Sequence, residues 1–344
     1  METDNPALKR YRRMAWITIA AVYFLILVGA TVRASGSGMG CPDWPTCFGS
    51  WVPPTSEAQL PVNYQEIYAE LGYSDTRFNV VKTWTEYANR LLGVSIGFLI
   101  FLTAIYSWSC RAHDTRIFKA SVAAFLMVGF QGWLGSKVVS SNLLPGMITI
   151  HMLVALAIVG TLLYAVAQAR RGIMASQSVG NIDQRFGKWL YIVLGFTVLQ
   201  VAMGTQVREM TDFIRESQGE ELRSSWIDAM PWFFYVHRSF SAVVLFANLW
   251  LARLLVMSLG WQHTLSRLTL TMICVIGAAV SSGAALGHLG MPALVQPTHL
   301  LAASLLFGLQ FLIWMSYRHS RDGNISNSSS KSDFDLPVGD EVTV

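Results

Sequence analysis

Eight long runs of apolar residues alternate with polar stretches along the chain. Each run has about the 20 residues that an α-helix needs to cross roughly 30 Å of hydrocarbon. The pattern therefore predicts an all-α, polytopic membrane protein with eight transmembrane helices. The predicted helices cover residues 14–33, 84–109, 117–137, 146–168, 187–207, 232–257, 266–287 and 294–317.

The composition supports this fold class. Of the 344 residues, 53% are hydrophobic and only 13% are charged, whereas a soluble domain carries about 25% charged residues. A chain with so few charges cannot cover a water-facing surface, which excludes an ordinary soluble protein and makes the lipid bilayer the expected environment. The net charge of +4 is spread thinly, so no nucleic acid is expected as a partner.

Basic residues mark every second connection between the predicted helices. The positive-inside rule places connections of this kind in the cytoplasm. Both termini, residues 1–13 and 319–344, are therefore predicted to be cytoplasmic, and the Ser- and Asp-rich tail is predicted to be disordered. The opposite side carries two outer loops, residues 34–83 and 208–231.

A repeat relates the first four helices to the last four. The first helix ends in Gly29-Ala-Thr-Val-Arg33 and the fifth in Gly204-Thr-Gln-Val-Arg208. Asn89-Arg90 in the second helix matches His237-Arg238 in the sixth, and 62 residues separate Asn89 from His151 as well as His237 from His299. We therefore expect two repeated four-helix bundles. They would cover residues 14–170 and 187–318, joined by a cytoplasmic linker at 171–186.

Three of the seven histidines lie inside apolar helices, namely His151, His237 and His299. Ionisable residues are costly in a membrane span and usually functional. Because His237 and His299 lie at matched depth, the two imidazoles could bind one heme iron from both faces. A lone histidine is more often hydrogen-bonded to a neighbouring helix, but the repeated spacing favours heme. His288, in a short outer loop, has no assigned role.

Charged residues near the outer face add candidate chemistry. Arg90 and Arg238 could pair with heme propionates, and the alternative is that they extend toward lipid headgroups. Glu86 lies three residues before Asn89, on the same helical face. Glu86 could relay protons or stabilise a developing cation, and the alternative is a helix-start residue favoured by the dipole.

Two cysteines, Cys41 and Cys47, lie in the longer outer loop. That compartment is oxidising, so the two can form a disulfide, although two free thiols are the alternative. Cys110 and Cys274 lie in apolar segments and are expected to be plain core residues.

These motifs resemble the heme A synthase family over about residues 14–318. The resemblance rests on GSGMGCPDWPTCFG after the first helix, TEYANRLLG in the second, QGWLG with His151, VHR at 236–238 and PTHLLAA at 297–303. It implies a multi-pass enzyme of the bacterial cell (inner) membrane that oxidises a ring methyl of heme O to a formyl group. Two successive hydroxylations and loss of water would give heme A for terminal oxidases.

The resemblance also implies where the hemes bind. His237 and His299 would ligate a heme b cofactor, with Arg238 beside it. His151, Asn89 and Arg90 would bind the substrate heme, and Glu86 would be catalytic. Heme O synthase, a farnesyltransferase, and an unidentified electron donor are the implied partners.

One residue departs from the family pattern. Asn89 stands where the family motif most often has His, and Asn is a poor iron ligand. His151 alone could then hold the substrate iron, leaving the Asn89 face open to the oxidant, although a binding-only site is the alternative. A di-heme b-type electron carrier and a heme transporter also stay open. The carrier would need two bis-histidine sites, and Asn89 removes one of them.

Overall fold

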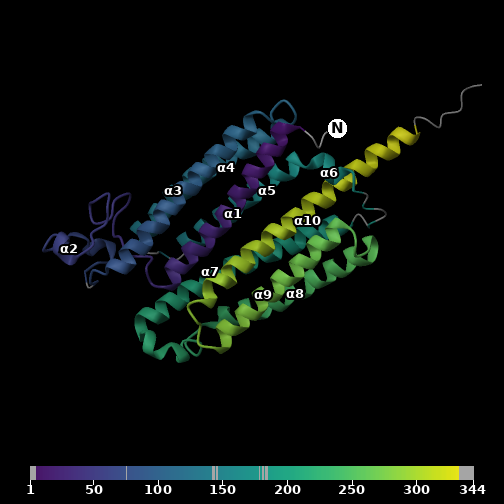
Figure 1. The fold of residues 1–344 in the computed structure, drawn as a ribbon. Helices are drawn as coiled ribbons and strands as arrows, with labels where there is room; N and C mark the ends of the chain where they lie inside the picture. The colour runs from purple at the N-terminus through teal and green to yellow at the C-terminus, as the bar shows by residue number, and fades with distance from the viewer. Residues whose placement is uncertain are drawn as a thin grey trace, which may run out of the picture.

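The structure is a computed structural model that describes residues 5–74, 76–141, 144, 146–177, 179, 182 and 185–332, with side chains up to residue 323. Within these residues eight helices are long and apolar enough to cross a membrane, and no strand is present (Figure 1). The eight are α1 (Pro6–Ala34), α3 (Val80–Trp108), α4 (Thr115–Ser140), α5 (Met147–Ala169), α7 (Arg185–Gln218), α8 (Trp232–Leu259), α9 (Thr264–His288) and α10 (Val295–Ser332). Two short helices, α2 (Tyr64–Ile67) and α6 (Arg171–Ala175), lie in the connections.

All eight predicted helices are confirmed, and three of them extend well beyond their predicted limits. α1 begins at Pro6, where the side chain of Asn5 caps the helix by accepting a hydrogen bond from the Ala7 N–H at 2.9 Å. α7 continues to Gln218, into the predicted outer loop. Hydropathy detects only the embedded part of a helix, so polar extensions of this kind leave no apolar signal.

The C-terminal end of the chain also differs from its prediction. α10 continues to Ser332, so residues 319–332 are helical where a disordered tail was expected. The rest of the predicted tail, residues 333–344, lies outside the described residues, as does part of the predicted linker 171–186. The described part of that linker contains α6.

The first four long helices form a closed ring. α1 and α4 each contact both α3 and α5, so α3 and α5 occupy opposite corners. Their apolar faces build one core, whose most buried members include Tyr11, Ile100, Ile117 and Leu162. Burial of this kind is driven by close contact rather than by water exclusion, because the lipid outside is equally apolar.

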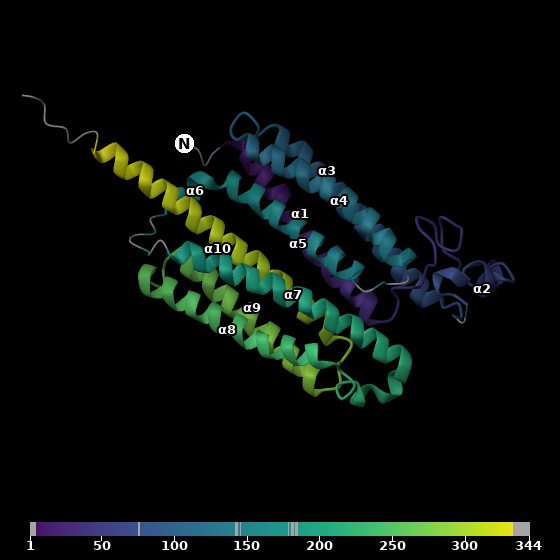
Figure 2. The same cartoon turned by 180° about the vertical axis from the view of Figure 1, so that it is seen from behind.

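The last four long helices repeat the same arrangement. α7 and α9 each contact both α8 and α10, which places α8 and α10 on opposite corners. A second core lies inside this ring and includes Leu190, Leu251, Leu265 and Met272. In the view from behind, the two bundles lie side by side along their length (Figure 2).

α10 joins the two bundles. It contacts α1 and α5 as well as its own neighbours α7 and α9. Phe311 and Leu312 of α10 lie against the first core, whereas Leu306 and Ile313 belong to the second. The last long helix is therefore part of both hydrophobic cores.

The two ends of the molecule differ in character. The N-terminus and the end of α10 lie at one end, which we call the terminal end (Figure 1). The connection between α1 and α3, residues 35–79, lies at the other end, together with the connection between α7 and α8. We call this second end the loop end.

We propose that the terminal end faces the cytoplasm, because the basic connections lie there. Green fluorescent protein fused to the C-terminus should then fluoresce, and alkaline phosphatase should be inactive at that position. Alkaline phosphatase fused after Val62, a fully exposed residue of the loop end, should be active. The reverse pattern would show that the orientation is wrong.

Candidate functional site

Four polar side chains lie inside the bundles at the positions that the sequence repeat singled out. Asn89 on α3 and His151 on α5 belong to the first bundle, and His237 on α8 and His299 on α10 belong to the second. Each of the four occupies one of two opposite corners of its ring. In each bundle, two helices at opposite corners therefore each carry one of these polar side chains.

A glycine of a neighbouring helix lies against each of these side chains. A Cβ atom added to Gly29 would lie 3.8 Å from Asn89 Oδ1. A Cβ added to Gly135, Gly204 or Gly283 would lie 3.4, 3.2 or 3.0 Å from Cε1 of His151, His237 or His299, respectively. Since the last two distances are tighter than ordinary contact, a larger residue at either of these two glycines would force the histidine ring to shift.

In the second bundle, both histidines have a ring nitrogen that is free of hydrogen bonds to the described residues. His299 Nδ1 lies 2.9 Å from the Ala279 carbonyl and 3.1 Å from Ser282 Oγ. A proton on Nδ1 would satisfy the carbonyl and leave Nε2 as a free electron pair, the pattern typical of metal-binding histidines. His237 Nδ1 is buried and has no hydrogen-bond partner among the described residues. The two rings are close enough to interact electrostatically.

The first bundle also contains buried polar atoms that lack hydrogen-bond partners. Gln131 Nε2–H donates to the His151 carbonyl at 3.0 Å, but His151 Nδ1 is buried and unpaired within the described part of the chain. Asn89 Oδ1 is also buried without a partner there. Buried polar atoms are nearly always hydrogen-bonded, so these orphaned atoms indicate that a bound group completes the site.

A heme fits this set of donors better than a bare metal ion does. No group of three or more His, Cys, Asp or Glu side chains with metal-binding geometry occurs among the described residues. Two imidazoles on opposite corners of a helix bundle are instead the usual axial ligands of a flat macrocycle. His237 and His299 meet this requirement, and Asn89 with His151 meets half of it.

Glu86 is buried beneath the outer loop, with a residue exposure of 4%. Its Oε1 accepts from Arg90 Nη2–H at 2.5 Å and from Arg90 Nε–H at 3.1 Å. Its Oε2 accepts from the backbone N–H of Cys41 at 2.9 Å. Glu86 is therefore not a solvated helix-start charge, because it ties the loop to the first turns of α3.

Arg90 uses its whole guanidinium group for the same purpose. Besides Glu86, it donates from Nη1 to the Asp43 and Thr46 carbonyls, at 2.6 and 2.9 Å. Nη2 also donates to the Cys41 carbonyl at 3.2 Å. An arginine has five N–H donors, and these contacts occupy all of them. The geometry therefore favours a structural role over the predicted binding of a propionate.

The predicted disulfide between Cys41 and Cys47 is present. Gly40 approaches α3 so closely that an added Cβ would collide with the Lys82 carbonyl, and Thr83 Oγ1–H donates to the Gly40 carbonyl at 2.8 Å. Tyr73 donates its hydroxyl proton to the Met39 carbonyl. Burial and the nearby charge of Glu86 raise the pKa of Tyr73, so that hydroxyl stays a donor.

The remaining predicted residues are less embedded. Arg238 follows His237 on α8 and is exposed, and its side chain makes no hydrogen bond to any described residue. His288 is exposed at the end of α9. Cys110 is buried as expected, whereas Cys274 is exposed on its helix.

Sequence reasoning missed one charged cluster near the loop end. Asp212, on the unpredicted extension of α7, pairs with Arg33 of α1 at 2.8 Å and with Arg208 at 2.6 Å. The repeated Gly-x-x-Val-Arg motif was the available signal for the two arginines. Nothing in the sequence singled out Asp212, because the hydropathy pattern placed it in the predicted outer loop 208–231.

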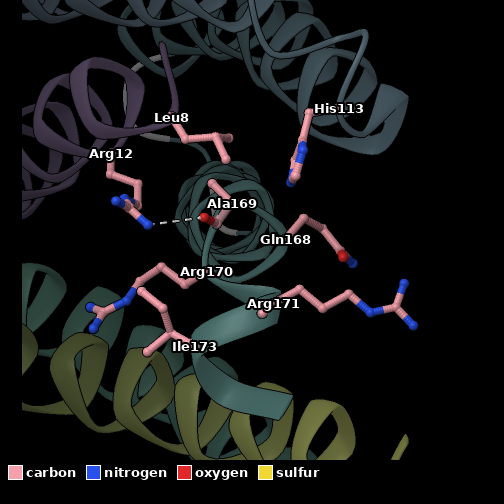
Figure 3. A pocket seen from close by; sticks show the side chains of 9 residues that line it. Leu8, Arg12, His113, Gln168, Ala169, Arg170, Arg171 and Ile173 are labelled. Atoms are coloured by element: carbon pink, nitrogen blue, oxygen red, sulfur yellow. Dashed lines mark hydrogen bonds between the residues drawn. The ribbon is translucent and has the colours of Figure 1, made fainter. Parts of the chain in front are cut away.

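A small pocket at the terminal end is lined by basic side chains but is not part of this site (Figure 3). Arg12 donates to the carbonyl of Ala169 there at 3.4 Å, so a cation lies at the C-terminus of α5, where the helix dipole favours it. Ala169 is 18 residues beyond His151 on the same helix, about 27 Å at 1.5 Å per residue.

Fold and site together define a multi-pass membrane protein with two four-helix bundles, one of which has a histidine on each of two opposite helices. Residues 12–311 match the family described as COX15-CtaA, cytochrome oxidase assembly protein. Because this match covers most of the 344 residues, the chain belongs to that family.

The chain is also similar to individual proteins that are named heme A synthase. The chain is 29% identical over 185 residues to a protein named heme A synthase from Shewanella oneidensis, with 53% of each chain covered. It is 29% identical over 178 residues to the Methylobacterium radiotolerans heme A synthase, with 48% of each covered. Identity to the Alkalihalophilus pseudofirmus heme A synthase is 26% over 206 residues, covering 58% of this chain and 60% of the relative. The chain thus spans about half the length of these relatives, all of them bacterial.

The contacts of Arg90 generate a prediction about the loop. Arg90→Gln leaves the Glu86 carboxylate buried without its cation, which costs on the order of 1–3 kcal/mol. We expect the loop to loosen and the Cys41–Cys47 bond to be reduced several-fold faster by dithiothreitol, as counted by alkylation under native conditions. Unreduced, unfolded wild-type protein should show two reactive thiols, and reduced protein four.

The matched control is Arg116→Gln, which removes an ion pair to Asp114 at the terminal end, with a distance of 2.8 Å. Reduction of the disulfide should proceed there at the wild-type rate. An unchanged reduction rate in Arg90→Gln would show that Arg90 does not hold the loop.

Proposed function

We propose that the protein is a heme A synthase, which oxidises a ring methyl of heme O to the formyl group of heme A. The observation that carries this proposal is the asymmetry of the two bundle centres. Histidines stand on both opposite corners in the second bundle, whereas the first has one histidine and an asparagine. One half is equipped to hold a heme permanently, and the other is equipped to hold one with a face left open.

In the second bundle, His237 and His299 would hold a resident heme b. Gly204 and Gly283 leave space for the two rings, and the hydrogen bond from His299 Nδ1 to Ala279 fixes that ring's orientation. A heme b bound there would supply one-electron transfer. The residues contribute orientation and an apolar surrounding that keeps water away.

In the first bundle, His151 would hold the iron of the substrate heme. Asn89 would leave the opposite face of that heme free, because its carbonyl oxygen is a weak ligand for iron. Glu86, together with Arg90, would keep the disulfide loop over the mouth of this bundle. We therefore propose Glu86 as a positioning residue whose carboxylate also sets the charge near the site.

The proposed reaction converts a methyl group to an aldehyde in three stages. Two successive hydroxylations would give a geminal diol, which loses water to form the formyl group. Both hydroxylations draw on an oxidant and an electron donor outside the chain. The protein's part is to fix the methyl group in place and to exclude bulk water. A heme O synthase would supply the substrate.

Two other functions predict different behaviour. A di-heme b-type electron carrier needs two equivalent sites, which the pair of Asn89 and His151 does not support. A heme transporter releases its heme unchanged, whereas an enzyme releases a heme with altered mass. Analysis of the extracted hemes therefore separates the three functions.

The decisive experiment is expression of the full chain in cells that make heme O but lack their own heme A synthase. Mass analysis of extracted hemes should detect the formyl-bearing product. His237→Ala and His299→Ala should each lose the low-spin heme b spectrum of purified protein and most of the product. Unaltered heme O from the wild type would contradict the proposed activity, and a full low-spin signal in either variant would contradict the ligand assignment.

Asn89→His tests the role of the open face. An imidazole at position 89 would face His151 as His237 faces His299, so we expect a six-coordinate, low-spin heme in the first bundle. Turnover should fall at least several-fold, because a strong sixth ligand competes for the face that the oxidant needs. Asn89→Gln, which keeps an amide, is the control. Equal or faster turnover in Asn89→His would show that oxidation occurs away from that face.

A further inference from the structure

Three arginines converge on one carboxylate at the loop end, where α1 meets α7. Arg33 Nε and Nη2 both lie 2.8 Å from Asp212 Oδ2. Arg208 Nη2 lies 2.6 Å from Oδ1 of the same residue and 3.2 Å from the Arg33 carbonyl. Arg215 is more distant, at 3.8 Å from Oδ1. The cluster joins the two bundles through Asp212, which is only 8% exposed.

The cluster carries more positive than negative charge. Glu209 is the other carboxylate beside it, held by a hydrogen bond from the Gly146 N–H at 3.2 Å. The neighbouring Arg223 is paired with Glu220. Three arginines therefore face two carboxylates, and the three arginine side chains are only 18–19% exposed. A partly buried excess of positive charge favours a further anion at this place.

The register of the two helices directs this charge toward the bundle centres. Arg33 follows Gly29 by four residues and Arg208 follows Gly204 by four, so each arginine stands one turn, about 6 Å, nearer the loop end on the same helical face. Gly29 contacts Asn89, and Gly204 contacts His237. Each arginine thus follows by one helical turn the glycine that lies against Asn89 or His237.

Both arginines retain donors for an additional ligand. Among the described residues, Arg33 Nη1 has no hydrogen-bond acceptor, and neither do Arg208 Nε and Nη1. Arg90, the arginine first expected to bind a propionate in the first bundle, has no donor left. Guanidinium groups bind carboxylates strongly because two N–H donors can match two oxygens.

We propose that Arg208 and Arg33 bind the propionate carboxylates of the hemes in the second and first bundles, with Asp212 positioning both guanidinium groups. This assignment rests on the proposed function, since it presupposes a heme in each bundle. Because Asp212 contacts both arginines, the acidic edges of the two hemes would be held by one continuous ion network. The arginines of α1 and α7 would then do what the sequence alone assigned to Arg90.

The test uses full-length protein purified from heme-depleted cells, titrated with hemin and with hemin dimethyl ester, whose propionates carry no charge. Wild-type protein should bind hemin roughly 10-fold or more tightly than the ester, the value of a charge-assisted hydrogen bond. Arg208→Gln should reduce this preference to near unity at the second-bundle site, followed by its low-spin spectrum, by weakening hemin and leaving the ester unchanged. Arg208→Lys should keep part of the preference, which separates loss of the cation from a folding defect.

Arg33 is tested in the His237→Ala background, where only the first bundle should bind hemin. There Arg33→Gln should remove the preference for hemin over its ester. Arg215→Gln is the matched control, because it contacts the same Asp212 but lies outside the glycine register. It should keep the wild-type preference in both backgrounds.

The outcomes separate this proposal from the function on which it rests. A full preference for hemin in Arg208→Gln would overturn the assignment, and so would an equal loss in Arg215→Gln, which would mean that only the overall charge matters. If His237→Ala instead kept the low-spin heme, the proposed heme site itself would be wrong, whatever the arginine variants did.

Discussion

Polar groups at the centre of an apolar helix bundle need partners, and here the bundles do not supply them all. In hydrocarbon an unpaired polar atom costs several kcal/mol, on the order of 2–7. His151 Nδ1, His237 Nδ1 and Asn89 Oδ1 are buried without hydrogen bonds to described residues. The glycines opposite these side chains keep the surrounding space open. The rest of the site follows from this constraint, since the helices hold polar atoms whose partners the described residues do not supply.

The two bundles carry different polar side chains at these positions, although their four helices are arranged in the same way. In the second bundle a histidine stands on each of two opposite corners. In the first bundle asparagine replaces one of them, and Glu86 and Arg90 bind the loop that carries the disulfide. The replaced ligand and the added cap occur in the same half. A site that keeps its occupant needs neither, whereas a site that exchanges its occupant needs access and a cover.

The helices and the histidine positions could be predicted from the sequence because both depend on local pattern. A run of about 20 apolar residues identifies a span without knowledge of its neighbours, and the spacing between Asn89 and His151 repeats between His237 and His299. The role of Arg90 could not be predicted, since its acceptors are carbonyls of a loop more than 40 residues earlier in the chain. Asp212 was missed because charged residues end an apolar run even where the helix continues.

The position of α10 has a consequence for how the protein is made. It carries His299 and contributes to both hydrophobic cores, yet it is synthesised after the other seven long helices. The second ring lacks one of its four helices until this segment has entered the membrane, whereas the four helices of the first ring are already present. Under the proposed function, His237 and His299 could hold a heme together only after α10 has been inserted. The second site would therefore be completed after the first ring has formed.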